Sequence, residues 1–275
     1  MRKITLVTLI GVLVPLFSFC QFWEFGVMLG ASSYSGDLSP TPIVLKETHF
    51  AFGGLVRANV TDRFSLKANA YYGRLSGTDE NAVTQKNKIR NLSFRSNVLD
   101  IGLNAEVNFV PFEAGNPNKR TAPYGFFGVS VFKFDPEALF NEQWVRLQPL
   151  GTEGQGTTRF NEREKYALTQ IALPFGIGLK HNLGSNWNIG FEMGWRKTFT
   201  DYIDDVSMTY VNPDYLQSES GELSNYLSNR TGEVNGTRVL FDETEQRGNA
   251  TNKDWYSFGG ITITYTILQG SCFTF

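Results

Sequence analysis

The chain has 275 residues, of which 41% are hydrophobic and 19% charged, and its formal net charge is −2 at pH 7. This near balance lacks the basic excess that nucleic-acid binding requires, so no nucleic-acid partner is expected. Beyond the N-terminal region no segment approaches about eighteen consecutive apolar residues, which excludes a membrane protein built from helices.

The first predicted element, residues 1–20, has the pattern of an export signal. Arg2 and Lys3 supply a positive start, a mostly apolar run follows, and small residues occupy the positions that a signal peptidase reads before its cut. The apolar run, at about fourteen residues, is too short to span a bilayer as a helix. A lipoprotein signal with Cys20 acylated is the alternative, but Phe19 stands where such signals need a small residue. We therefore expect cleavage after Cys20.

The remaining chain, 21–275, is predicted to form one domain of eight strands. In each strand one alternate-residue face is free of charge; in the first, Trp23, Phe25 and Val27 share a face opposite Glu24. Such strict period-two alternation indicates a strand with one apolar and one polar side. The predicted strands are 22–32, 50–60, 64–74, 98–109, 124–134, 167–180, 187–198 and 255–267.

The lengths of the strands and of their connections predict an all-β fold, an eight-stranded antiparallel transmembrane β-barrel in the outer membrane of a Gram-negative bacterium. Strands of about nine to eleven residues separated by polar segments are typical of such barrels, which have short periplasmic turns and longer external loops. The connections 61–63, 181–186 and 110–123 are short or intermediate, and the four long ones are 33–49, 75–97, 135–166 and 199–254. Both termini are therefore expected in the periplasm, and the apolar faces are expected to contact outer-membrane lipids. A soluble β-sandwich would alternate as well, but it rarely combines an export signal with such long, uncharged faces.

Aromatic residues at the strand ends are expected to lie at the two membrane interfaces. The predicted inner girdle comprises Trp23, Phe64, Tyr124 and Trp187, and the outer one Trp195, Trp255 and Tyr256. The fifth strand is aromatic on both faces, at Phe126, Phe127 and Phe132, so its register is left open.

Four acidic and four basic residues are predicted to point into the barrel. They are Glu24, Asp100, Glu106 and Glu192, with Arg57, Lys67, Lys180 and Arg196. An eight-stranded barrel is only wide enough for its own side chains, so these charges must pair with one another and cannot line a channel. The equal numbers predict a filled barrel and exclude a porin.

Residues for catalysis are scarce. The two histidines, His49 and His181, are predicted at opposite ends of the barrel. An outer-membrane enzyme could combine His49 with Ser33, Ser35 and Asp37, but an ordinary loop histidine is the simpler interpretation. No catalytic residue and no cofactor is predicted.

Two segments of the long loops have unusual compositions. Asp201, Asp204 and Asp205 follow the seventh strand, but their spacing does not match a calcium-binding loop, so solvated acids or pairs with loop arginines are expected and no metal site is predicted. The segment 147–156 is rich in glycine but lacks the Gly-Lys-Ser/Thr of a phosphate-binding loop. We expect it to fold tightly over the barrel mouth, where glycine permits positive φ angles.

Four short motifs resemble the PorG-type outer-membrane barrel of the type IX secretion system. They are Leu-Gly-Ala-Ser-Ser-Tyr-Ser-Gly-Asp-Leu at 29–38, Ala-Pro-Tyr at 122–124, Leu-Gly-Thr-Glu-Gly-Gln-Gly at 150–156 and Asp-Tyr-Ile-Asp-Asp-Val-Ser at 201–207. The resemblance extends from about residue 26 to 265, but 213–253 shows no matching motif. It implies a non-enzymatic subunit of the machinery for protein secretion and gliding, associated with a periplasmic ring that is built from a lipoprotein and its partner. Candidate interaction residues in the loop motifs are Gly36, Asp37, Gly151, Glu153, Gly154, Gln155, Asp201, Tyr202, Asp204 and Asp205.

Removal of the export signal would leave one cysteine, Cys272, in the predicted periplasmic tail 269–275. A lone cysteine in an oxidising compartment predicts an intermolecular disulfide or a free thiol. Given the resemblance, the expected partner is the ring lipoprotein. Two further functions stay open: a generic small barrel that tethers the envelope or binds a surface ligand, and an outer-membrane enzyme.

Overall fold

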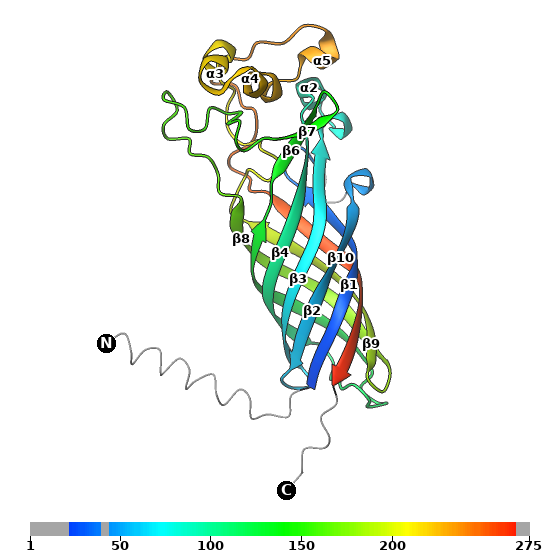
Figure 1. The fold of residues 1–275 in the computed structure, drawn as a ribbon. Coiled ribbons are helices and arrows are strands. Elements are labelled where there is room, and N and C mark those ends of the chain that lie inside the picture. The colour runs from blue at the N-terminus through cyan, green and yellow to red at the C-terminus, as the bar shows by residue number, and fades with distance from the viewer. Residues whose placement is uncertain (1–21, 40–43, 268–275) are drawn as a thin grey trace, which may run out of the picture.

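The computed structural model describes residues 22–39 and 44–267 (Figure 1). The predicted export signal 1–20 and the tail 269–275 with Cys272 lie outside these residues. Among the helices in the described ranges, none is both long and apolar enough to cross a membrane.

Eight strands close into a barrel, as predicted. They are β1 (Phe22–Ser35), β2 (His49–Asn59), β3 (Phe64–Thr78), β4 (Ser93–Asn108), β5 (Thr121–Lys133), β8 (Thr169–Gly184), β9 (Trp187–Thr198) and β10 (Trp255–Ile267). Their order around the barrel is β3-β2-β1-β10-β9-β8-β5-β4, and β4 pairs with β3 to close the ring. Every pairing is antiparallel. The predicted fold class is confirmed.

Some strands run beyond their predicted bounds. The bounds of β9 and β10 match the prediction, whereas β3 extends to Thr78 and β4 begins at Ser93. In these extensions Leu75 and Phe94 still point inward and are buried, while Arg74 faces outward. The alternation therefore continues, but polar residues have replaced apolar ones on the outer face. The sequence pattern thus marked the apolar belt and not the full length of the strands.

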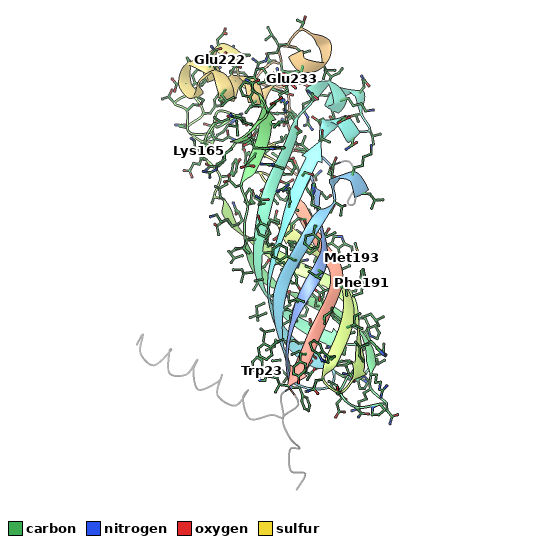
Figure 2. All side chains as sticks on the ribbon, turned by 45° about the vertical axis from the view of Figure 1, so that its right-hand side comes forward. Trp23, Lys165, Phe191, Met193, Glu222 and Glu233 are labelled. Atoms are coloured by element: carbon green, nitrogen blue, oxygen red, sulfur yellow. The ribbon has the colours of Figure 1, made fainter. Side chains whose placement is uncertain are left out.

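The outer face of the barrel is apolar. Exposed side chains include Ile101 at 57% and Phe191 at 55% of their full areas. Figure 2 shows Trp23 near the turn end and Phe191 and Met193 on the outside of β9, whereas Lys165, Glu222 and Glu233 lie at the opposite end. A soluble monomer rarely exposes so large an apolar surface, so this belt fits the hydrocarbon region of a bilayer.

The inside of the barrel is more aromatic than predicted. In β5, Phe127 faces outward while Phe126 and Phe132 point inward and are buried, which settles the open register. Tyr124 and Tyr256, predicted in the interfacial girdles, are also buried inside. The girdle assignment was wrong for both because their hydroxyls reach interior carboxylates, Tyr124 donating to Glu192 and Tyr256 to Asp100.

The long connections fold into a cap above the barrel (Figure 1). The sequence indicated loops here, whereas the structure has a hairpin and short helices. These elements are η2 (Leu45–Glu47), η3 (Asp79–Asn81), α2 (Gln85–Arg90), β6 (Pro136–Phe140), β7 (Gln143–Arg146), α3 (Pro213–Ser220), α4 (Glu222–Ser228) and α5 (Gly232–Asn235). The hairpin β6–β7 pairs with the extended end of β4. Its two-residue turn is Asn141–Glu142, both at positive φ, as hairpins of this length favour.

Candidate functional site

The barrel interior is organised around Glu106 on β4. Its carboxylate accepts from Arg57 Nε at 2.7 Å and lies 3.2 Å from Lys67 Nζ and 3.8 Å from Lys180 Nζ. These three cations come from β2, β3 and β8, so one buried acid joins three other strands. Period-two geometry places all four side chains on the inner face of their strands.

The remaining interior charges extend this network. Arg57 also binds Glu24 at 2.6 Å, Lys67 also forms an ion pair with Glu192, and Arg196 lies 4.0 Å from Asp100. The structure thus brings each predicted interior charge within ion-pair distance of an opposite charge, and none of the eight is more than 4% exposed. Burial of an ion costs several kcal/mol unless a partner compensates, which this arrangement provides. These side chains fill the barrel.

The turn end is closed from below by the connection between β4 and β5. Phe112 in this connection is only 4% exposed, and its backbone N–H donates to the carbonyl of Asp62 at 2.9 Å. Lys180 Nζ lies 4.8 Å from the centre of the Phe112 ring and 5.2 Å from that of Tyr124. The aromatic faces stabilise an ammonium whose nitrogen has no hydrogen-bond acceptor among the described residues.

A second buried network holds the cap, and its centre is the ion pair of Glu153 with Arg247, 2.9 Å apart. The two oxygens of Glu153 also accept the backbone N–H groups of Ser207 and Met208 at 2.9 and 3.0 Å. Arg247 donates further to the carbonyls of Asp205 and Ser228. Glu153 and Arg247 therefore join the 135–166 connection to both ends of the 199–254 connection.

Asp205 lies beside this pair and is fully buried. Its carboxylate accepts from Thr152 and from Tyr166 Oη, and Arg247 Nη2 lies 3.9 Å away. Burial raises the pKa of Asp205 to about 6, although Arg247 acts in the opposite direction. The ring of Tyr166 also stacks on that of Tyr202, with centroids 4.7 Å apart.

A third contact joins the cap to the barrel rim at Tyr34. The Tyr34 hydroxyl lies 2.7 Å from Asp204 Oδ2 and 2.8 Å from Asp254 Oδ1. Gly36 leaves room for this contact, because a Cβ there would lie 2.0 Å from both Asp254 Oδ1 and Tyr34 Oη. The carboxylate of Asp37 accepts the backbone N–H of Asn249 at 2.7 Å.

Arg90 on α2 connects the remaining loop. It forms a two-point ion pair with Asp79, with both distances 2.8 Å, and it donates to the carbonyls of Asp37 and Arg247. The sequence alone does not identify Arg90 and Arg247 as functional residues. The buried acids imply that cationic partners exist, but no local spacing identifies which arginines they are.

The predicted loop residues thus converge, but they are largely buried. Glu153, Gln155, Asp204 and Asp205 are at most 2% exposed, and Asp201 is 3% exposed. Burial raises the pKa of Asp201 to about 7, with Asp37 adding to the effect. Gly151 and Gly154 adopt φ angles of +62° and +79°, which only glycine adopts readily. The motifs brace the cap from within. Of the two alternatives expected for the aspartates, solvation was wrong because all three are buried, whereas Asp205 lies within ion-pair distance of the loop arginine Arg247.

The residues of the enzymatic alternative do not assemble. His49 Nε2 lies 2.7 Å from Ser76 Oγ, and Asp37 is engaged by Asn249. Ser33 and Ser35 line a notch beside Trp195 and Trp255. His181 contacts Thr121 at the other end of the barrel. Within the described ranges, no group of three or more His, Cys, Asp or Glu side chains has the arrangement of a metal site.

Three solved outer-membrane structures share the barrel architecture. The N-terminal β-barrel domain of Pseudomonas aeruginosa OprF has 10% identity and a TM-score of 0.39 over 90% of this chain and 98% of its own. Ail, the attachment invasion locus protein of Yersinia pestis, has 10% identity and a TM-score of 0.41 over 90% and 99%. The outer membrane protein OprG of Pseudomonas aeruginosa has 9% identity and a TM-score of 0.38 over 91% and 97%.

Among curated proteins none matches this chain. A family model described as "Domain of unknown function (DUF6089)" matches residues 3–226. Because that range covers well over half of the sequence, the chain belongs to the DUF6089 family.

Proposed function

We propose that this protein is a non-enzymatic outer-membrane subunit of the type IX secretion machinery, which also drives gliding, and that it docks the periplasmic ring complex. The main support for the proposal is the filled interior. Because eight charged side chains occupy the barrel, we propose that its function depends on the surfaces at its two ends and not on a pore. The resemblance of the four motifs to PorG-type barrels supplies the identity of the machine. The partners would be the ring lipoprotein and the protein bound to it.

The short-turn end is proposed to face the periplasm and to carry the docking surface. There Lys119 bridges Asp62 at 3.2 Å and Glu113 at 3.3 Å, which ties the β4–β5 connection to the β2–β3 turn. Beside them is a cavity of about 110 Å³ whose walls include Phe22, Phe112 and Glu113. A charged rim around a small apolar recess is a usual composition for a protein contact.

Affinity purification from solubilised outer membranes tests this proposal. A tag inserted at Gly232 in the cap leaves the turn end free, and the ring proteins should co-purify with the tagged barrel. Glu113→Lys should abolish that co-purification, whereas the matched reversal Glu222→Lys on α4 should not. Absence of the ring from the unmodified sample, together with normal cargo secretion after deletion of the gene, would overturn the proposal.

Cys272 offers a separate test of the partner. We propose that it bonds to the ring lipoprotein through a disulfide. Non-reducing gels of membranes treated with an alkylating agent should then show a heavier species that disappears in Cys272→Ser. A fully alkylated monomer would refute the covalent link and leave non-covalent docking to the purification experiment.

A surface-ligand function is the second candidate. The cap exposes apolar side chains far from the membrane belt, with Leu240 at 75% and Val234 at 51% of their full areas. Exposed apolar groups on a polar cap favour contact with another molecule. Retained secretion in the deletion strain together with lost surface binding would support this alternative.

A further inference from the structure

The contact between Tyr34, Asp204 and Asp254 has two hydrogen bonds, and the hydrogen atoms available for them follow from the chemistry of the three groups. The hydroxyl oxygen of Tyr34 lies within hydrogen-bond distance of one carboxylate oxygen from each aspartate, at 2.7 and 2.8 Å. None of the three residues is more than 1% exposed. A tyrosine hydroxyl has one hydrogen and ionised carboxylates have none, so one hydroxyl cannot donate to both. One of the two carboxyl groups must therefore bring a proton.

The other oxygen of each aspartate is already engaged. Asp204 Oδ1 accepts the backbone N–H of Val206 at 2.9 Å, and Asp254 Oδ2 accepts that of Ile203 at 2.8 Å. Only the two oxygens that face Tyr34 remain for the proton. Because their distances to Tyr34 Oη are those of direct hydrogen bonds, the contact is a chain of carboxyl, hydroxyl and carboxylate.

The charged surroundings favour the protonated form. Burial raises the pKa of both Asp204 and Asp254 well above the ordinary value, and each carboxyl is close to further acids. The nearby titratable and charged groups are Asp37, Asp201 and Glu153, with Arg90, Arg247 and Lys253 on the positive side. Arg90 and Arg247 are already paired with Asp79 and Glu153, so they compensate little of the negative charge on the pair.

The contact joins three neighbouring strands at the rim. Tyr34 lies at the end of β1, Asp254 directly precedes β10, and Asp204 follows β9 in the segment that enters the cap. In the barrel β1, β10 and β9 are adjacent. We propose that one proton shared by Asp204, Tyr34 and Asp254 holds the cap on the barrel rim and that its loss in alkaline medium releases the segment 201–207.

The sign of the pH dependence of cap opening follows from the number of protons that each form binds. The closed cap binds one proton more than the open cap, in which both aspartates are hydrated and ionised above about pH 4. Opening therefore becomes more favourable as the pH rises, by about tenfold per pH unit, until the closed form also loses the proton. Near pH 4 the two aspartates of the open cap together bind about one proton, as the closed cap does, and the dependence vanishes.

The variant Asp204→Asn distinguishes the effect of the shared proton from the titration of the other nearby acids. The asparagine amide can donate to Tyr34 Oη while Tyr34 donates to Asp254, and the asparagine oxygen can still accept from Val206. The variant therefore keeps the hydrogen bonds without a titrating proton. Asp254→Asn is the equivalent change on the other side, and Asp214→Asn on α3 removes an exposed charge from the same connection as a control.

Hydrogen exchange of the purified full chain in detergent measures the opening. The rate for peptides covering 199–210, divided by the rate for Asp204→Asn at the same pH, cancels the intrinsic pH dependence of exchange. Above pH 5 this ratio should rise by about tenfold per unit until the closed form also loses the proton, and the corresponding ratio to Asp254→Asn should rise in the same way. The ratio for Asp214→Asn measured against the unmodified protein should stay constant.

The proposal would be overturned if the exchange rate of the unmodified protein, divided by the rate of either rim variant, did not change with pH. It would also be overturned if the ratio of the unmodified protein to Asp214→Asn rose by the same factor. Repeating the series with EDTA and with added Ca²⁺ distinguishes a proton from a metal ion. Protection that requires Ca²⁺ and is lost in EDTA would mean that a cation and not a proton joins the two carboxylates.

Discussion

Replacing Glu106 by Gln is expected to lower the free energy of unfolding of the barrel by about 3 kcal/mol. The carboxylate is fully buried and is the common partner of Arg57, Lys67 and Lys180. Removal of one member of a buried ion pair generally costs about 3–5 kcal/mol, because an uncompensated charge stays in a medium of low dielectric constant.

We expect a loss at the lower end of this range because two of the three cations keep another carboxylate partner. Arg57 keeps Glu24 at 2.6 Å and Lys67 keeps Glu192, so only Lys180 loses its carboxylate within ion-pair distance. The double variant Glu106→Gln with Lys180→Met restores equal numbers of interior acids and bases. It should therefore recover most of the lost stability, in a double-mutant cycle whose coupling exceeds about 1 kcal/mol.

Urea unfolding in phospholipid vesicles measures these differences. The fraction folded is read from tryptophan fluorescence and from the shifted gel mobility of unheated barrels, and Asp214→Asn is the surface control. A loss below about 0.5 kcal/mol for Glu106→Gln is the size of an ordinary surface substitution and would refute the assigned interior role. So would a double variant less stable than the single one.

Four further outcomes are expected. Planar-bilayer recordings of the purified protein should show no stable conductance, and reproducible large open steps would contradict the filled interior. Tags at Asn81 and Gly232 should be labelled on intact cells and a tag at Asp62 should not; the reverse pattern would invert the proposed topology. Gly154→Ala should destabilise the cap by about 1–2 kcal/mol, because φ is +79° there, and protease resistance of the cap would report it; unchanged resistance would contradict the strain. Because the folded pKa of Asp205 is raised to about 6, its proton favours the closed cap and this contribution should be lost between about pH 4 and pH 6; hydrogen exchange should show that loss in the unmodified protein and not in Asp205→Asn.

The barrel could be predicted because its two environments impose a period of two on the sequence. Lipid-facing positions must be apolar and interior positions must be compact or paired, so alternation shows directly which face each residue occupies. Ile261 and Thr262 on β10 differ in this way, the first 51% exposed and the second 3%. The interior position of residues such as Glu106 and Arg57 follows from the same alternation.

The tyrosine assignments failed because strand position alone does not show which face an aromatic residue takes. Tyr124 and Trp187 both stand near the starts of strands, yet Trp187 is 51% exposed and Tyr124 is 1% exposed. A phenol hydroxyl can satisfy a buried carboxylate, whereas an interfacial aromatic residue needs only to straddle lipid and water. Tyr124 shares its inward face with Phe126 and Phe132, so no charged residue on that face of β5 marks it as the interior one.

The cap could not be predicted from local patterns. Its contacts join residues that are distant in the sequence; Tyr34 is 170 positions from Asp204 and 220 from Asp254. The loop motifs resemble those of a known family, but that resemblance does not show that they are buried. Their burial depends on contacts with Arg90 and Arg247, which lie in polar segments without a distinctive pattern. Short helices such as α3 are set by local capping at Asn212 and Pro213, and their packing is set by the tertiary contacts.

The two buried polar networks differ in a way that separates a permanent part of the molecule from an adjustable one. Inside the barrel each carboxylate faces a guanidinium or an ammonium group, as Glu106 faces Arg57, so ionisation of one partner supports that of the other. At the rim Asp204 and Asp254 face each other across a single hydroxyl, so ionisation of one opposes that of the other. We therefore expect the barrel to stay closed under conditions in which the proposed proton contact lets the cap open. Under the two proposals made above, regulated contacts are expected at the loop end, and the turn end is the constant surface proposed for a stable partner.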